Sequence, residues 1–422
     1  MRLPVSLREP QYRRYVAANV FSLQGIWAQR TVVAWLAWEL SGSASWVGIV
    51  AFLSFAPTFV SGPVFGVYAD RGDLRRAALQ VQFAIIAVAL ALFALLAAGA
   101  LTLAALAAVA LAQGVAISAH HPIRLALTPR LAPRTALPNA IAISAINFNL
   151  ARLTGPAIAG YALDAFGATA TVGICAALLL PMAATVPTLS PRPADGPQTT
   201  EVGLAAALTE GLRFAWGTPV IRAALLLTVV FAVAVRGYLE LLPVVADGAF
   251  ARGATGLGEL MAAAGAGALT AALTLSTRDW VTEARVPPAT VVAVFVGFAA
   301  AAGAATSPVW IGAVALTAVA GFCGTVIGVT LQSVVQIATD DAHRGRVLSL
   351  WIIVGVGSAV VGALFMGAVA DLFGIGRTVA GASALGAVAA GVIRYRRWRM
   401  RRSSASRNRD RSALEKGRPP PP

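Results

Sequence analysis

The sequence predicts an all-α integral membrane protein with twelve transmembrane helices, arranged as two halves of six. Three observations carry this prediction: the composition, the recurrence of long apolar runs, and a repeat at half the chain length. Of the 422 residues, 58% are hydrophobic and 12% are charged, and the mean hydropathy is +0.75. This chain is far more apolar than an ordinary soluble domain, so water is not its main solvent.

Long apolar runs recur along the whole chain, and a bilayer core of roughly 30 Å needs about 20 helical residues per crossing. Helices fit these runs better than strands, because the runs are too long and too uniformly apolar for the alternation of a membrane β-barrel. The predicted spans are residues 15–40, 46–69, 77–98, 101–119, 139–163, 169–189, 219–243, 256–277, 288–306, 309–333, 347–370 and 376–394.

Arginine residues cluster in alternate loops and so orient the chain in the membrane. The termini and loops of the first group hold Arg2, Arg8, Arg13, Arg14, Arg71, Arg75, Arg76, Arg124, Arg130, Arg134, Arg192, Arg213, Arg278, Arg285, Arg344 and Arg346. The loops on the other side hold only Arg252 and Arg377. This bias predicts that both termini are cytoplasmic in a multi-pass protein of a bacterial inner membrane. Because the net charge of +15 resides in loops and tail, it does not indicate nucleic-acid binding.

The fifth predicted span recurs half a chain later. Its closing pattern G-x3-D-x-F-G over residues 160–167 returns over residues 367–374, and 367 − 160 gives a shift of 207. The same shift carries Gly155 onto Gly362. A related Gly-x3-Asp ending closes the second span, which favours three-plus-three repeats nested within each half.

This repeat and the polar stretches divide the chain into four parts. Residues 1–189 form an N-terminal six-helix half, and residues 219–395 form its C-terminal counterpart. Residues 190–218 form a cytoplasmic linker that is rich in Pro and Gly at its start, with a short surface helix expected near its end. Residues 396–422 are Arg-rich and finish with four prolines, which predicts a disordered basic cytoplasmic tail beside anionic lipid.

The run GVYADRGDLRR over residues 66–76 lies in the turn between the second and third spans. It resembles the G-x-x-x-D-R-x-G-R-R signature of the major facilitator superfamily, with Asp73 where the signature has a small or aromatic residue. The resemblance implies a cytoplasmic gate, in which the Asp would meet the start of the eleventh span near residues 346–349. The implied gate residues are Gly66, Asp70, Arg71, Arg75 and Arg76. A simple cationic anchor with a turn is the alternative.

Gly155, Pro156 and Gly160 form a candidate hinge in the fifth span. Pro156 has no N–H to donate and should kink the helix, while the two glycines let a neighbouring helix close over it. The run resembles the G-P-x-x-x-G part of a signature of drug/proton antiporters in the same superfamily, which implies export. The alternative is a packing kink with no directional meaning.

The stretch over residues 122–160, together with the leader LREPQY over residues 7–12, resembles the branch of the superfamily that contains enterobactin exporters and macrolide-efflux-like proteins. One departure concerns the fourth span, where proton antiporters often have R-x-x-Q-G. Ala110 stands at the position of that Arg, so the resemblance does not carry proton coupling to this position.

Polar residues inside membrane spans are energetically expensive, so they are candidates for a substrate and proton pathway. The candidates are Arg30, Gln24, Gln29, Asn147, Arg152, Arg236, Glu240, Gln332 and Gln336. Glu240 follows Arg236 by four residues, on the same helix face. Because a carboxylate beside a guanidinium can exchange this partner for a proton or a cation, Glu240 is the leading candidate for a proton carrier. A fixed structural ion pair is the alternative.

These features together predict a monomeric secondary transporter that exports an amphipathic small molecule, such as a drug, macrolide or siderophore, by alternating access with proton antiport. The alternatives are a facilitator that imports a small metabolite and a non-transporting membrane sensor or scaffold. No phosphate-binding loop G-x-x-x-x-G-K-[ST] occurs, which argues against ATP-driven transport. We expect no enzyme activity, no cofactor and no metal; the expected partners are the substrate, protons and the lipid bilayer, with no nucleic acid.

Overall fold

A computed structural model describes residues 4–71, 73–193, 204–277, 280–340 and 343–416, with the backbone alone described at residues 59–71, 204–208, 345 and 396–416. The described residues form helices joined by turns and short loops, and none of them lies in a β-strand. Within these ranges, nine helical segments are long and apolar enough to cross a membrane. The prediction of an all-α multi-pass membrane protein is therefore confirmed.

The first half of the chain forms a bundle of long helices. They are α1 (Pro10–Ser41), α2 (Ala44–Arg71), α3 (Leu74–Ala97), α4 (Leu103–Leu131) and α5 (Leu137–Thr185). Short 3-10 turns flank them at Val5–Arg8, Arg134–Ala136 and Val186–Thr188. We call the end of the bundle where α1 begins the N-terminal face, and the end where α1 finishes the opposite face.

The predicted fifth and sixth spans follow one another without a loop inside α5. The chain reverses at Gly167, whose φ of 74° and ψ of 173° are not helical. A glycine can adopt this positive φ without a steric penalty, so the sharp turn needs no further residues. The backbone keeps helical dihedral angles at Pro156, so the predicted kink is absent there, and the break in α5 lies beyond the predicted hinge, at Gly167.

The second half of the chain begins with α6 (Leu204–Gly217), which matches the short helix predicted near the end of the linker. The predicted seventh span, residues 219–243, is divided into α7 (Pro219–Phe231), the π-helix η4 (Ala232–Arg236) and α8 (Gly237–Glu240), and a second π-helix, η5 (Val244–Ala249), follows it. The remaining helices are α9 (Gly253–Ser276), α10 (Pro288–Thr306), α11 (Trp310–Ala338), α12 (Arg344–Phe373) and α13 (Ile375–Lys416). π-Helical turns inside membrane helices often mark functional positions, and two of the predicted pathway residues adjoin η4.

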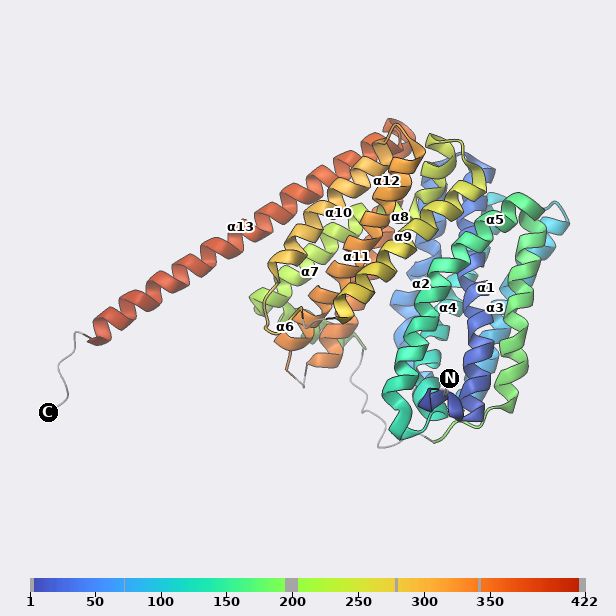
Figure 1. The fold of residues 1–422 in the computed structure, drawn as a ribbon, viewed down its shortest axis with the longest axis horizontal. Helices are drawn as coiled ribbons and strands as arrows, with labels where there is room; N and C mark the ends of the chain where they lie inside the picture. The colour runs from blue at the N-terminus through green and yellow to red at the C-terminus, as the bar shows by residue number, and fades with distance from the viewer. Residues whose placement is uncertain (1–3, 72, 194–203, 278–279, 341–342, 417–422) are drawn as a thin grey trace.

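Figure 1 shows two bundles, α1–α5 and α7–α13, that lean together at the opposite face and diverge toward the N-terminal face. Glycines of the repeat allow the closest helix approaches within each bundle. A Cβ on Gly155 would lie 2.8 Å from the Cβ of Trp27 in α1. A Cβ on Gly362 would lie 2.6 Å from the Cα of Val233 in η4. The two glycines thus face the first helix of their own half.

The next glycines of the repeat face the other half. A Cβ on Gly160 would lie 2.7 Å from the Cα of Gly258 in α9. A Cβ on Gly367 would lie 3.3 Å from the Cα of Ser45 in α2. The α5–α9 and α2–α12 pairs therefore form two matching seams between the bundles. The 207-residue shift relates Gly160 in the first seam to Gly367 in the second.

Two predictions from the sequence differ from the structure at helix ends. Residues 396–416 continue α13 as a helix (Figure 1) instead of forming a disordered tail. No glycine or proline lies between Gly391 and Gly417, so nothing in this stretch interrupts the helix.

Arg124, expected in a loop, lies inside α4 with 7% exposure. The guanidinium of Arg124 lies 4.9 Å from the ring centroid of Phe148. This cation–π contact stabilises the buried positive charge.

Candidate functional site

A cavity of about 300 Å³ lies between the two bundles. Four charged side chains line it: Arg30 from α1, Arg152 from α5, Arg236 from η4 and Glu240 from α8. All four are predicted pathway residues, and each half of the chain supplies two of them. The structure therefore brings the predicted intramembrane charges together at one site, which we call the central cavity.

An ion pair joins the two bundles inside the central cavity. The Nη2 atom of Arg30 lies 2.8 Å and 2.6 Å from the two carboxylate oxygens of Glu240. The two side chains are only 19% and 23% exposed, so solvent screens the pair incompletely. The sequence suggests Arg236 as the partner of Glu240, but the Nη2 atom of Arg236 is directed toward Gly328 in α11.

Aromatic rings hold Arg30 in place from the other side. Its guanidinium carbon lies 4.3 Å from the ring centroid of Phe55 and 5.2 Å from that of Trp27. Such cation–π contacts stabilise a guanidinium that has left water. Neither aromatic residue was predicted from the sequence, although Trp27 precedes Arg30 by one helical turn and therefore lies on the same face.

The rest of the cavity wall is mostly apolar. It includes Phe231, Leu239, Met261, Ala264 and Val360, together with Pro156 of the predicted hinge. A wall of this kind accepts an apolar body, while the charged groups orient a polar one. The central cavity thus has the composition of a binding site for an amphipathic molecule.

The other predicted pathway residues do not belong to the set that lines the central cavity in the described part of the chain. Gln24 donates a 2.6 Å hydrogen bond to Thr154, which ties α1 to α5. Gln29 and Asn147 are buried in the first bundle, whereas Gln332 is half-buried and Gln336 is exposed on α11. Helix–helix contacts explain Gln24 best, in agreement with the general role of polar residues between membrane helices.

Polar contacts fasten the two bundles at the opposite face. The Oδ1 atom of Asp371 in α12 accepts a 2.7 Å hydrogen bond from the N–H of Ala44, and its Oδ2 atom accepts a 2.6 Å bond from Ser43. Trp38 in α1 donates a 2.8 Å bond to Asp247 in η5. The sequence identified Asp371 only as part of the repeat, because nothing in its spacing shows that it meets the start of α2.

A family model described as "transmembrane secretion effector" matches residues 4–416. The chain belongs to this family, within the major facilitator superfamily. It is 28% identical over 380 residues to "Enterobactin exporter EntS" of Escherichia coli O139:H28 (strain E24377A / ETEC), covering 88% of each protein. The homologous exporter of Escherichia fergusonii shows the same identity and coverage.

Solved transporter structures share the fold of this chain. The nucleoside transporter NupG is 16% identical with a TM-score of 0.67, over 92% of this chain and 98% of that one. A bacterial homologue of the human lysosomal transporter Spinster, in an inward-facing and unoccupied conformation, is 16% identical with a TM-score of 0.65. That match covers 91% of this chain and 94% of that one. The family and the fold make this protein a transporter.

The predicted gate of the transporter is only partly visible. Only the backbone is described at Gly66, Asp70 and Arg71, so the predicted contact of Asp70 with α12 stays a prediction. Arg75 and Arg76 are exposed in the first turn of α3. Asp73, which departs from the superfamily signature, is the N-cap of α3 and accepts hydrogen bonds from both of their N–H groups, at 3.0 Å and 3.2 Å.

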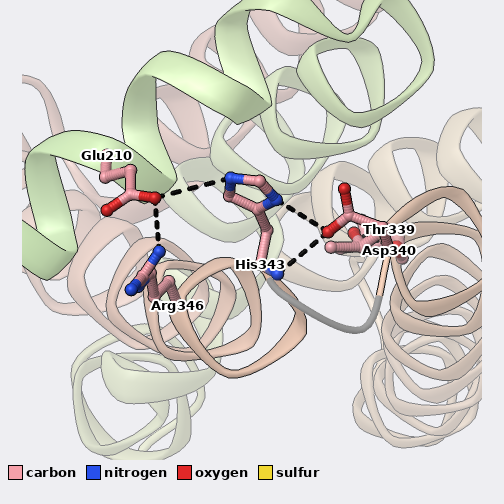
Figure 2. A network of polar contacts seen from close by, with 6 residues as sticks. Glu210, Thr339, Asp340, His343 and Arg346 are labelled. Atoms are coloured by element: carbon pink, nitrogen blue, oxygen red, sulfur yellow. Dashed lines mark hydrogen bonds and ion pairs between the residues drawn. The ribbon is translucent and has the colours of Figure 1, made fainter.

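A polar network at the N-terminal face joins α6 to the start of α12 (Figure 2). Glu210 accepts a hydrogen bond from Arg346 and lies 3.5 Å from Nε2 of His343. The other ring nitrogen of His343 lies 2.7 Å from Asp340. The hydrogen bonds that Asp340 makes with the ring and the backbone N–H of His343 hold the pKa of Asp340 below its usual value. Phe214 of α6 stacks on the His343 ring with a centroid distance of 4.4 Å, so α6 is attached to α12 by both polar and aromatic contacts.

Proposed function

We propose that this transporter crosses the membrane twelve times and exports an amphipathic small molecule from a bacterium by alternating access. The observation that carries the proposal is the central cavity, in which charged groups of both halves meet and one ion pair joins the halves. A site at the interface of two repeats is the site that a rocking motion exposes to each side in turn.

The topology follows from the helices and the arginines. Gly167 divides α5 into two spans, and α1 and α2 add two further crossings to the long apolar segments. The arginine-rich loops support an orientation with the N-terminal face in the cytoplasm. In this orientation the hydrogen bonds of Asp371 and Asp247 fasten the outer side, so the described conformation is closed toward the outside.

Export is favoured over import by two lines of support. The curated relatives at 28% identity are enterobactin exporters, and the G-P-x-x-x-G run in α5 resembles the signature of drug/proton antiporters. The mixture of aromatic, apolar and charged groups in the central cavity suits an amphipathic cargo such as a siderophore, macrolide or drug.

Glu240 is the proposed proton carrier. Its carboxylate is the acidic group that lines the central cavity among the described residues, and its described partner, Arg30, lies in the other half. Protonation would remove the negative charge of this ion pair and so loosen one connection between the halves. A fixed ion pair that never takes up a proton is the alternative.

Vesicle orientation tests the proposal. Inverted and right-side-out membrane vesicles with and without the protein are compared for uptake of a panel that includes a catecholate siderophore, a macrolide and an amphipathic dye. Accumulation in inverted vesicles supports export, whereas accumulation only in right-side-out vesicles would identify an importing facilitator. Absence of transport in both orientations, with correctly folded protein, would favour a sensor or scaffold.

A further inference from the structure

We propose that the cargo of the central cavity is an organic anion, with at least one carboxylate, sulfonate or phosphate group beside an apolar body. This inference rests on the proposed transport function and names its substrate class. It comes from the balance of charge inside the cavity, which the general preference for amphipathic molecules does not specify.

Three guanidinium groups and one carboxylate line the central cavity among the described residues: Arg30, Arg152, Arg236 and Glu240. Glu240 neutralises Arg30. Arg152 and Arg236 have no hydrogen bond or ion pair with a described side chain in the molecule. Glu240 attracts Arg236 as well as Arg30, and Arg152 is repelled by both of these arginines. With one carboxylate for three guanidinium groups, the cavity holds excess positive charge among the described residues.

Three other described acidic residues near the seams do not supply the missing counter-charge, because they accept hydrogen bonds at the opposite face. Asp371 accepts hydrogen bonds from the start of α2. Asp247 accepts a hydrogen bond from Trp38, and Glu259 accepts one from Trp310 at 2.7 Å. An uncompensated cation inside a membrane protein is expensive, so its retention in a cavity indicates an anionic ligand.

The geometry of guanidinium narrows the chemistry further. Its planar N–H groups pair with carboxylate, sulfonate and phosphate oxygens in a bidentate manner, and it is more weakly hydrated than an ammonium group. Beside these groups, the rings of Trp27, Phe55 and Phe231 and the thioether of Met261 line the wall. An anion with an aromatic or aliphatic body matches both surfaces at once.

The charge of the cargo also determines whether protonation of Glu240 strengthens or weakens cargo binding. Protonation of Glu240 would release Arg30 and leave three free guanidinium groups in the cavity. Proton uptake would then strengthen the binding of an anion, whereas it would compete with a cationic cargo. For an anion, protonation of Glu240 and cargo binding favour one another. A membrane potential that is negative inside favours outward movement of the anion only after the proton has left, because a proton and a monovalent anion together carry no net charge.

A matched pair of probes tests the inference on the purified full-length protein in lipid nanodiscs. The anion is 2-naphthalenesulfonate, and the cation of similar size and shape is 2-naphthylmethylammonium. Calorimetric titration should give a Kd for the anion at least about tenfold lower than that for the cation. Arg152→Gln and Arg236→Gln should each weaken anion binding by about tenfold or more.

Two controls keep the test independent of folding. Arg285→Gln removes an exposed arginine outside the central cavity and should leave both Kd values unchanged, and Arg236→Lys should restore most of the anion binding. Equal affinity for the two probes, or preference for the cation, would overturn the inference even if vesicles show export. Selective anion binding without accumulation in inverted vesicles would instead support the charge inference and reject export.

Discussion

Arg30 and Glu240 form the one ion pair that crosses between the two bundles among the described side chains, with an N–O distance of 2.6 Å. The pair lies in the central cavity rather than at either face. Any motion that separates the bundles at this level must break it, and any ligand or proton that weakens it lowers the free energy needed for that motion. The pair therefore couples the occupancy of the cavity to the conformation of the transporter.

Glu240→Gln should remove this coupling. The substitution leaves Arg30 without its counter-ion in a partly buried site, so we expect a loss of about 1–3 kcal/mol in stability, between the values for exposed and fully buried pairs. A lower Tm in detergent and the loss of pH-driven exchange in proteoliposomes would follow. If the fully folded variant retains normal pH-driven exchange, Glu240 is not the proton carrier.

The matched control is Glu259→Gln, because Glu259 lies in the same half but bonds to Trp310 near the opposite face. This variant should retain pH-driven exchange. The double variant Arg30→Gln/Glu240→Gln should recover part of the lost stability, since it removes both members of the ion pair and leaves neither without its partner. Full additivity of the two single losses would show that the residues do not interact.

The sequence predicts the four charged cavity residues because intramembrane charges are rare and conspicuous. It does not predict that Arg30 and Glu240 meet, since 210 residues separate them and only the packing of the halves brings them together. It also fails to reveal Phe55, because an aromatic residue in an apolar helix looks the same whether it faces lipid or a cavity. The sequence predicts helix boundaries least well. Pro122 and Pro129, for example, lie inside α4 without ending it.

Gly160→Leu should prevent the described closure of the α5–α9 seam. A Cβ at this position would lie 2.7 Å from the Cα of Gly258, and overpacking of this kind costs about 1–3 kcal/mol. That penalty falls mainly on the conformation closed at the opposite face, so the balance should shift toward its open counterpart by about 5- to 150-fold. Spin labels at Phe166 and Val309, both exposed near the opposite face, should report longer distances.

Gly381→Leu is the control for this effect. Gly381 lies in α13, and a Cβ there has no heavy atom within 4 Å. The distance distribution between the same two labels should remain that of the parent protein. An unchanged distribution in the Gly160 variant as well would mean that the α5–α9 seam does not govern closure.

Asp371→Ala should loosen the second seam. Asp371 accepts hydrogen bonds from Ser43 and from the N–H of Ala44, and thus satisfies the first turn of α2 as a capping residue would. Loss of a helix cap typically costs about 1 kcal/mol. We expect a lower Tm and faster hydrogen exchange at the start of α2.

Asp164→Ala is the matched control, because the 207-residue shift places Asp164 at the equivalent position (371 − 164 = 207) and it is exposed. Substitution there should change the stability by less than about 0.5 kcal/mol. Equal effects of the two substitutions would contradict a specific role for Asp371 at the seam.

Glu210→Gln should release α6 from α12. The substitution removes the negative charge that Arg346 and His343 share, so trypsin should cleave after Arg213 faster by about tenfold or more. Glu283→Gln, which alters an exposed pair with Arg285, should leave the cleavage rate unchanged.

Lowering the pH should also loosen the attachment of α6 to α12. The depressed pKa of Asp340 means that its stabilising contribution is present above the usual pKa of an aspartate and is lost as the pH falls through the lowered value.

Binding of 2-naphthalenesulfonate should become tighter when the Glu240 carboxylate is protonated. The charged groups that line the cavity around this carboxylate are Arg30 from α1, Arg152 from α5 and Arg236 from η4, and arginine stays cationic throughout the accessible range. Because the sulfonate also keeps its charge, Glu240 is the cavity group that can change the affinity. Calorimetric titrations over the pH range in which the protein stays folded would measure the change.

Glu240→Gln imitates the protonated carboxyl group, so this variant should bind the anion tightly at every pH and show no pH dependence. The parent protein should approach the affinity of the variant at the acidic end. Binding that weakens on acidification would mean that proton and cargo compete, as antiport requires, and would reject the co-binding inferred from the charges. A pH dependence that persists in the folded Glu240→Gln protein would instead assign the titration to another group.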